Sequence, residues 1–376
     1  MATVGPVNNN LSVSAGLLLS RLSLNPMRRC FCVVKTSRLI PAIIHGRLFT
    51  DKIRASSAAV VETKPDVMDE TKLDIRKKIL ACPICYERLI WNGDHDVSLE
   101  SVARSTLQCC TCKKSYSGKD SHLDLTITGG GTVYGQPMAA STELFRLPLV
   151  SFLYERGWRQ SFSVWGGFPG PEKEASDIKQ YHGSTCFLDN FELIKDYLKP
   201  VLGGNIIDAS CGSGMFSRLF AKSGLFSLVV ALDFSETMLQ QCHDFIKLED
   251  SFPKENLILV RADISRLPFT TSTVDAVHAG AALHCWPSPS AAVAEISRVL
   301  KPGGMFVATT YIVDGLLSYF PLRKPLRQNI AQLTGSHVFL SEGELEDLCT
   351  SCGLVNFKCT RSRSFVMISA MKPLQL

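Results

Sequence analysis

Residues 205–214 read Asn-Ile-Ile-Asp-Ala-Ser-Cys-Gly-Ser-Gly, so an apolar run ends in an acid and is followed by a loop of small residues. This order predicts a strand, a tight loop and a helix that begins near Met215. Glycines let a backbone approach a ligand closely, because a Cβ would block the approach. Asp208 is therefore expected at the carboxyl end of a strand, where ligands bind in open α/β sheets. Gly-rich turns are common, so the loop alone is a weak sign of a cofactor site.

Two further apolar runs also end in an acid. Residues 227–232 precede Asp233, and residues 257–262 precede Asp263. Unbroken apolar runs of this length are typical of buried parallel strands. An acid after the second strand can accept hydrogen bonds from ribose hydroxyls. The alternative role for Asp233 is a helix cap, although Ser235 offers that cap equally well and leaves Asp233 available for a ligand.

The rest of the C-terminal half continues the alternation of strands and helices. The pattern predicts a fourth strand over 274–280, a helix over 290–300, a stop at Lys301-Pro-Gly-Gly304 and a fifth strand over 305–310. Ser341 has the character of a helix cap, and two last strands are expected over 355–360 and 364–371. The predicted fold class is therefore α/β.

Four motifs taken together resemble the class I S-adenosylmethionine-dependent methyltransferases. They are the glycine loop, the acid after the second strand, Ala262-Asp-Ile-Ser-Arg-Leu-Pro-Phe269 and Arg298-Val-Leu-Lys-Pro-Gly-Gly304. The combination is most similar to the ubiquinone/menaquinone C-methyltransferase branch, and the resemblance covers about residues 185 to 371. It implies a seven-stranded Rossmann-like sheet of order 3-2-1-4-5-7-6 with strand seven antiparallel. Ser210 departs from the family, which usually has its first loop glycine there.

The resemblance also implies contacts to S-adenosylmethionine. Those expected around the methionine moiety are Asp208, Ser210, Gly212 and Gly214. Those expected around the ribose and adenine are Asp233, Phe234, Asp263 and Ile264, and the sulfonium would be bordered by Ala279 and Gly280.

Methyl transfer from a sulfonium depends mainly on alignment of nucleophile, methyl group and sulfur. A general base is needed only for a poorly nucleophilic acceptor. His284, which follows the fourth predicted strand, is the one candidate for that catalytic role. The alternative is a histidine that only packs or makes a local hydrogen bond.

A second module precedes the methyltransferase-like region. Two C-x-x-C pairs, separated by 23 residues, are formed by Cys82, Cys85, Cys109 and Cys112. Four thiolates at this spacing favour a structural zinc ion in a zinc-ribbon-like β module; disulfides, free thiols or a ribbon that has lost its metal are the alternatives. A ribbon before a methyltransferase also resembles the bacterial ribosomal-RNA guanine methyltransferases, although their ribbon typically ends in a Cys–His pair.

The N-terminus has a different composition from the rest. Residues 1–50 contain no Asp or Glu but several Arg, which is typical of an organellar transit peptide, and the Met-Ala-Thr start favours a plastid. An ordinary disordered tail is the alternative. The chain has 40 basic and 35 acidic residues; without the eight basic residues and one acidic residue of 1–55, 32 and 34 remain, a net charge of −2. This near-neutral remainder gives no electrostatic support for a polyanionic partner.

The expected organisation is a transit peptide over 1–55, a linker over 56–75, the zinc-ribbon-like module over 76–128, a linker and lid over 129–184, and the methyltransferase domain over 185–376. Tyr154, Trp158 and Phe168 are candidates for a lid that shapes the acceptor pocket, with packing onto the sheet as the alternative. No uncharged apolar stretch is long enough to span a membrane.

These observations predict a chloroplast methyltransferase, in the stroma or on plastoglobules, that acts on a small apolar acceptor such as a prenylquinone or lipid. The plastoglobule expectation comes from resemblance of the whole chain to plant plastid methyltransferases of this layout. A base in plastid ribosomal RNA is the second acceptor considered. An inactive binding or scaffold protein is the third possibility, and Ser210 is the residue that supports it.

Overall fold

The computed structural model describes residues 78–92, 99, 101–102, 105–128, 190–312, 339–362 and 365–375, all within the unit Lys64–Leu376. The predicted transit peptide, the linker over 56–75 and the lid segment lie outside the described residues, as do Tyr154, Trp158 and Phe168. Among the helices of the described ranges, none has the length and apolar character that a membrane span requires.

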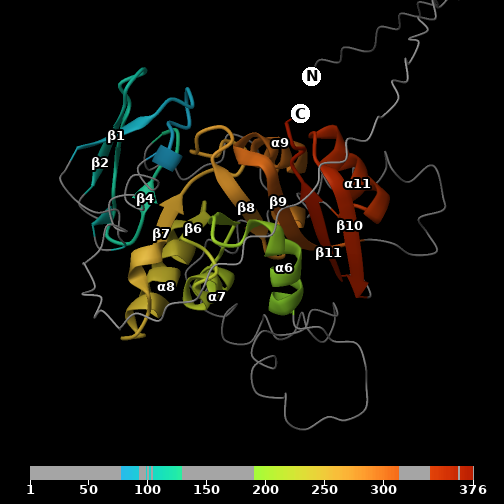
Figure 1. The fold of residues 1–376 in the computed structure, drawn as a ribbon. Coiled ribbons are helices and arrows are strands. Elements are labelled where there is room, and N and C mark those ends of the chain that lie inside the picture. Colours follow the sequence, from blue (N-terminus) through green and yellow to red (C-terminus); the bar gives the residue numbers. More distant parts are fainter. Residues whose placement is uncertain are drawn as a thin grey trace, which may run out of the picture. The chain divides into compact units, whose positions relative to one another are not determined.

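The largest element of the fold is one sheet of eight strands in the order β10-β11-β9-β8-β5-β6-β7-β4 (Figure 1). Its strands are β4 (Leu123–Asp124), β5 (Asn205–Ala209), β6 (Leu228–Asp233), β7 (Leu257–Arg261), β8 (Val274–Ala279), β9 (Leu300–Tyr311), β10 (Val355–Ser362) and β11 (Phe365–Met371). Strands β4 to β9 pair in parallel, and β11 runs antiparallel to both β9 and β10.

The predicted sheet was wrong in strand count and in its order at one edge. The prediction ended the sheet at the third strand of the domain, but β4, from residues before that domain, pairs with this strand, β7. The seven strands from β5 to β11 are neighbours in the expected order, with the last strand antiparallel. The edge therefore belongs to a segment for which the sequence pattern gave no strand signal.

The fifth strand begins earlier than predicted. It starts at Leu300 rather than Met305, so the Lys-Pro-Gly-Gly turn is part of the strand. Gly303 has φ +80°, a conformation that glycine tolerates best, and its N–H donates to the Lys372 carbonyl at 2.9 Å. The Lys372 N–H returns a bond to the Gly304 carbonyl at 2.9 Å, which extends the pairing with the chain that follows β11.

Helices cover both faces of the sheet because successive strand residues point to opposite faces. Ile206 belongs to the same buried cluster as side chains of α6 (Asn190–Leu198), α7 (Met215–Ser223) and α8 (Glu236–Lys247), whereas Ile207 belongs to a second cluster with side chains of α9 (Pro289–Val299) and α11 (Glu342–Ser351). Short 3-10 helices occur at η3 (Lys199–Val201), η4 (Lys254–Asn256) and η5 (Leu283–Cys285). Ser341 and Glu344 form the capping box expected at the start of α11.

Residues 78–92 and 105–128, called the cysteine module below, form a small antiparallel sheet of β1 (Leu89–Asn92), β2 (Thr106–Cys109) and β3 (Ser115–Ser117). Its buried side chains, among them Leu80, Leu107 and Leu123, belong to the same hydrophobic cluster as Ile207 and Val260 of the large sheet. The module is therefore packed onto the large sheet through one continuous core.

Candidate functional site

The predicted cofactor residues meet at the carboxyl edge of the parallel strands. Asp208 lies near the end of β5, where it is level with Ala231 of β6 and His278 of β8. Asp233 ends β6 and Ala279 ends β8. This edge is where open α/β sheets bind ligands, so the structure brings together the residues that the sequence placed at separate strand ends.

The loop after β5 has the backbone that a close ligand approach requires. Gly212 has φ +57°, and a Cβ built there would have no atom within 4 Å, so it would project into open space beside the loop. Gly214 has φ +77°, and a Cβ there would lie 2.1 Å from Cys242 Sγ of α8. Gly214 therefore lets α7 pack against α8, and Gly212 takes up a left-handed backbone conformation that glycine tolerates best.

Asp233 holds the glycine loop in place. Its Oδ2 accepts the Gly212 N–H at 2.9 Å, and its Oδ1 accepts the Ser235 N–H at 2.7 Å. Ser235 caps α8 through its side chain, as predicted, but Asp233 also binds the backbone at that helix start. Burial raises the pKa of Asp233, although the backbone N–H groups of Ser235 and Gly212 oppose this rise. Each carboxylate oxygen keeps a further lone pair for a hydroxyl donor.

Ser210 adopts the left-handed backbone conformation of the glycine it replaces, with φ +58°. This conformation is unfavourable for a residue with a Cβ. The Ser210 hydroxyl accepts a hydrogen bond from the indole N–H of Trp286 at 2.9 Å, and the Trp286 side chain is buried. Sequence reasoning missed Trp286; the departure at Ser210 was the signal that a polar partner had to be found for a side chain in this loop.

A buried network lies at the end of β5, next to the loop. Asp208 is 1% exposed, and its Oδ1 lies 2.7 Å from Nδ1 of His278, which is fully buried. The Ser217 hydroxyl donates to the other carboxylate oxygen. His278 Nε2 has no hydrogen-bond partner within the described residues, and the rings of Phe216 and Phe220 pack on the imidazole at 4.7 and 5.3 Å. The buried His278 and Ser217 side chains therefore fix the orientation of the Asp208 carboxylate.

The chain after β8 is also strained and fixed. Ala281 has φ +49°, and its N–H donates to Thr309 Oγ1 of β9 at 2.7 Å. A Cβ at Gly280 would lie 3.1 Å from both His278 and Phe216, so that position has little room for a side chain. Non-glycine residues in the left-handed region cluster at functional sites, and Ser210 and Ala281 both lie at this edge.

The loop after β7 carries the last two predicted contacts. Asp263 Oδ1 accepts the N–H and the hydroxyl of Ser265 at 2.8 and 2.7 Å, which closes a local turn. Ile264 is 2% exposed and belongs to the hydrophobic core, as does Ala279. Phe234, after β6, is 8% exposed. Ile264, Ala279 and Phe234 are therefore buried apolar residues, and Asp263 is the polar residue among these predicted contacts.

His284 follows β8 and is part of an aromatic group at the carboxyl end of β9. Its ring stacks on Phe339 with centroids 5.8 Å apart and meets Tyr311 edge-on at 5.4 Å. Tyr311 in turn contacts Phe365 at 5.6 Å. His284 Nδ1 lies 3.1 Å from Thr310 Oγ1, which orients the imidazole. The predicted catalytic candidate is thus held by a hydroxyl and set in a wall of rings.

The four predicted metal ligands converge in the cysteine module. The sulfur atoms of Cys82, Cys85, Cys109 and Cys112 all lie within 4.8 Å of one another. Two of the pairs are 3.6 Å apart (Cys82 with Cys112) and 3.3 Å apart (Cys85 with Cys109). A tetrahedral zinc ion with Zn–S bonds of about 2.3 Å needs sulfurs about 3.8 Å apart, so the geometry fits this metal.

The two knuckles have matching backbones. The residue after each second cysteine, Tyr86 or Lys113, is left-handed, with φ +60° and +59°. In each knuckle a backbone N–H also donates to the first cysteine's sulfur at 3.4 Å, from Ile84 to Cys82 and from Cys112 to Cys109. Such donors stabilise thiolates, which are the form that binds metal.

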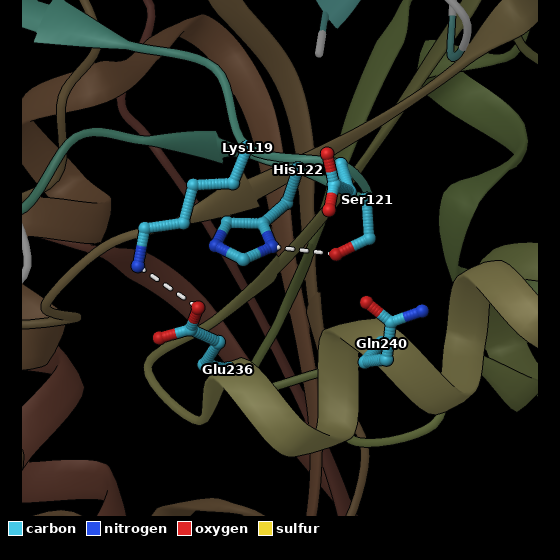
Figure 2. Close-up of a pocket in the computed structure, with 6 residues that line it drawn as sticks. Lys119, Ser121, His122, Glu236 and Gln240 are labelled. Atoms are coloured by element: carbon cyan, nitrogen blue, oxygen red, sulfur yellow. Dashed lines mark hydrogen bonds and ion pairs between the residues drawn. The ribbon is translucent and has the colours of Figure 1, made fainter.

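A polar cavity of about 290 Å³ lies apart from the predicted cofactor residues (Figure 2). Its lining comes from the loop before β4 and the first turns of α8: Lys119, Asp120, Ser121, His122, Glu236 and Gln240. Figure 2 shows Lys119 facing Glu236, with which it pairs at 2.9 Å, and His122 beside Ser121. His122 is 1% exposed, and burial lowers its pKa to about 4. The cavity therefore marks a contact between the cysteine module and α8.

Comparison with known proteins agrees with this architecture. A family model described as a methyltransferase domain matches residues 207–308. An Arabidopsis thaliana protein named as an uncharacterized chloroplastic methyltransferase is 63% identical over 299 residues, 79% of each chain. A second Arabidopsis thaliana protein of the same description is 47% identical over 85% of this chain and 87% of its own length.

A more distant relative matches only the core of the domain. The demethylmenaquinone methyltransferase of Staphylococcus aureus is 37% identical over 126 residues, 31% of this chain and 50% of its own. The long, high-identity matches to the two Arabidopsis proteins, together with the domain match, decide the family. The chain belongs to the S-adenosylmethionine-dependent methyltransferases and is an enzyme of that class.

Proposed function

We propose that this enzyme transfers a methyl group from S-adenosylmethionine to a small apolar acceptor in the chloroplast, such as a prenylquinone or another lipid. The observation that carries the proposal is the ring wall of His284, Tyr311, Phe339 and Phe365. It lies at the carboxyl end of β9 and the start of β11, and β9 pairs with β8, the strand that ends at Ala279. Aromatic side chains offer large apolar faces to a flat or hydrocarbon ligand.

Different residues at the carboxyl edge of the sheet would bind different parts of the cofactor. The glycine loop would hold the methionine moiety, with Asp208 fixed below it by His278 and Ser217. Asp233 would accept ribose hydroxyl protons, and Phe234, Asp263 and Ile264 would enclose the adenine. Bound S-adenosylmethionine supplies an electrophilic methyl group on a sulfonium. The protein contributes alignment, and His284, oriented by Thr310, is the candidate to take a proton from the acceptor.

The relatives support the compartment and, more weakly, the acceptor. Both Arabidopsis relatives are named chloroplastic, which agrees with the acid-free, Arg-containing residues 1–50. The bacterial relative is named for a demethylmenaquinone, a prenylated quinone. A plastoglobule location would bring such an acceptor within reach and is part of this proposal.

We also propose one structural zinc ion on Cys82, Cys85, Cys109 and Cys112. The convergence of the four sulfurs and the paired backbone donors support it. The ion would fix the knuckles of the cysteine module; it has no part in methyl transfer, because a four-thiolate site leaves no open position for a substrate.

The second acceptor considered is a base of plastid ribosomal RNA. A module with four cysteines before a methyltransferase domain favours it, but the net charge of −2 outside residues 1–55 does not. RNA binding would weaken steeply with salt, whereas transfer to an apolar acceptor would tolerate salt.

The test is transfer of a radiolabelled methyl group from S-adenosylmethionine to separated plastid lipid and RNA fractions, at low and at high salt. Label in the lipid fraction at both salt concentrations is expected. The Asp233→Ala protein serves as the control for non-enzymatic labelling. Label confined to RNA would support the second acceptor instead, and no transfer from a protein that fails to bind the cofactor would favour the scaffold role.

A further inference from the structure

The cysteine module touches the domain at the loop that follows β7. Arg266 of this loop donates from Nε to the Pro83 carbonyl at 2.8 Å and from Nη2 to the Ile84 carbonyl at 2.9 Å. Pro83 and Ile84 lie between the two cysteines of the first knuckle. The guanidinium therefore binds the backbone of the knuckle itself, and Arg266 follows Asp263 and Ile264 by only a few residues.

The aromatic ring after the same knuckle strengthens this contact. The Arg298 guanidinium of α9 lies 4.1 Å from the centroid of the Tyr86 ring, and that of Arg266 lies 5.5 Å away. Arginine over a tyrosine face is a favourable cation–π contact. Tyr86 is thus held by two arginines of the methyltransferase domain.

Backbone pairing fixes the end of the same loop. The Ala81 N–H donates to the Pro268 carbonyl at 2.8 Å, and the Thr270 N–H donates to the Ile79 carbonyl at 2.9 Å. The segment from Asp263 to Thr270 is therefore bound to the module by its backbone as well as by Arg266. This segment begins with the two residues expected at the adenine.

The second attachment is at the edge strand. β4 pairs in parallel with β7, and Asp124 Oδ2 lies 3.1 Å from Arg261 Nη1, with both side chains 3% exposed. Arg261 Nε donates to the Phe234 carbonyl at 3.0 Å, and its guanidinium lies 5.4 Å from the Phe234 ring centroid. The module thus reaches Phe234, the other residue expected at the adenine, through one buried arginine.

We propose that the cysteine module positions the adenosyl half of the cofactor site, so that metal binding by its four cysteines sets the affinity for S-adenosylmethionine. The inference rests on the cofactor roles proposed above for Phe234, Asp263 and Ile264. Arg266, Arg261, Tyr86 and Asp124 are positioning residues: they act on the cofactor through the loops that they hold. The module therefore acts on the cofactor site indirectly, through these loops.

The first test compares the full chain loaded with zinc, stripped by a chelator and reloaded, using calorimetry with S-adenosylhomocysteine as the probe. Affinity is expected to fall at least about fivefold on stripping and to return on reloading, the lower end of typical coupling between two sites. Hydrogen exchange supplies a second readout: the amides of residues 263–267 should exchange faster in the stripped protein while those of β5 keep their protection.

Arg266→Gln in the zinc-loaded protein separates positioning from loss of the fold. It removes the guanidinium group that binds the Pro83 and Ile84 carbonyls and leaves the four cysteines intact. Metal analysis verifies that the variant still holds its zinc. Arg88→Gln is the matched control, because Arg88 is exposed on the module. Weaker probe binding, a higher KM for S-adenosylmethionine and an unchanged kcat are expected for Arg266→Gln alone.

The outcomes distinguish this inference from the function on which it rests. If the loaded wild type does not bind the probe, the cofactor site and the inference both fail. If it binds, and Arg266→Gln binds equally well with unchanged exchange at 263–267, the inference is overturned while the proposed function stands. If stripping unfolds the whole chain, the comparison of Arg266→Gln with Arg88→Gln decides.

Discussion

Replacing Ser210 by glycine tests whether the loop depends on its bond to Trp286. Glycine relieves the left-handed strain, about 1–2 kcal/mol, but adds about 0.5–1 kcal/mol of chain entropy lost on folding. It also leaves the buried Trp286 indole N–H without its acceptor, a cost of about 1–3 kcal/mol. Central values predict that Ser210→Gly lowers the free energy of unfolding by about 1 kcal/mol.

The effect of Ser210→Gly on the free energy of unfolding should change sign when the indole N–H is absent. In a Trp286→Phe background only strain relief and chain entropy remain, so Ser210→Gly should then raise the free energy of unfolding by about 0.7 kcal/mol. Urea unfolding of the wild type, the two single variants and the double variant gives the coupling energy between Ser210 and Trp286, which is expected to be about 2 kcal/mol. A coupling below about 0.5 kcal/mol would mean that the bond does not offset the strain at Ser210.

The same four proteins report on cofactor binding. Ser210→Gly restores the family's glycine and removes a Cβ beside the ligand, so calorimetry should show S-adenosylmethionine binding that is equal or tighter. If neither the wild type nor Ser210→Gly binds the cofactor at millimolar concentration, the loop is not a working site.

Further predictions concern charges and metal. Asp233→Ala should weaken cofactor binding by roughly tenfold or more, because a charge-assisted hydrogen bond contributes about 1.5–3 kcal/mol; unchanged affinity in the folded variant would remove Asp233 from the site. Since burial raises the pKa of Asp233, wild-type affinity should fall on acidification starting above 3.8, the ordinary value for an aspartate. Metal analysis should find one zinc per chain, and a chelator should expose the four module thiols to alkylation; a folded module without zinc would contradict this. His122 is buried, and its pKa is about 4 instead of the ordinary 6.5, so the folded state resists protonation of this side chain. The free energy of unfolding should therefore fall as the pH drops from 6.5 to 4, by about 3 kcal/mol at most. His122→Gln should remove that part of the pH dependence, measured by urea midpoints, and an unaltered slope would assign it to other groups.

The sequence predicted well what local pattern controls. Asp208 lies one residue before the end of β5 and Asp233 ends β6, and the helix start at Met215 and the cap at Ser341 are observed as well, because apolar runs, small loops and capping residues act over a few positions. The convergence of the four cysteines was also predicted from their spacing, since paired knuckles bring thiols together when the segment between them folds back.

The sequence could not predict contacts that depend on distant segments. β4 has only two residues, too few to show periodicity, and its strand character comes from β7. The bond from Trp286 to Ser210 joins residues 76 positions apart, and the pair of His278 with Asp208 joins residues 70 apart. Local sequence rules do not identify such distant partners, although the departure at Ser210 indicates that its side chain needs one. The roles of the lid candidates and the transit peptide remain predictions, because they lie outside the described residues.

The pairing of β4 with β7 also bears on the order in which the chain folds. The bond between Asp124 and Arg261 spans 137 positions, and contacts so distant in sequence form slowly because a long loop must close first. Synthesis begins at the N-terminus, so β4 is made well before β7. Leu123 and Leu125, both almost fully buried in the finished protein, have no docking partner in β7 during that interval. The edge of the sheet at β4 can therefore close only after β7 has been made, whereas β8 to β11, which are made later still, join the opposite side of the sheet.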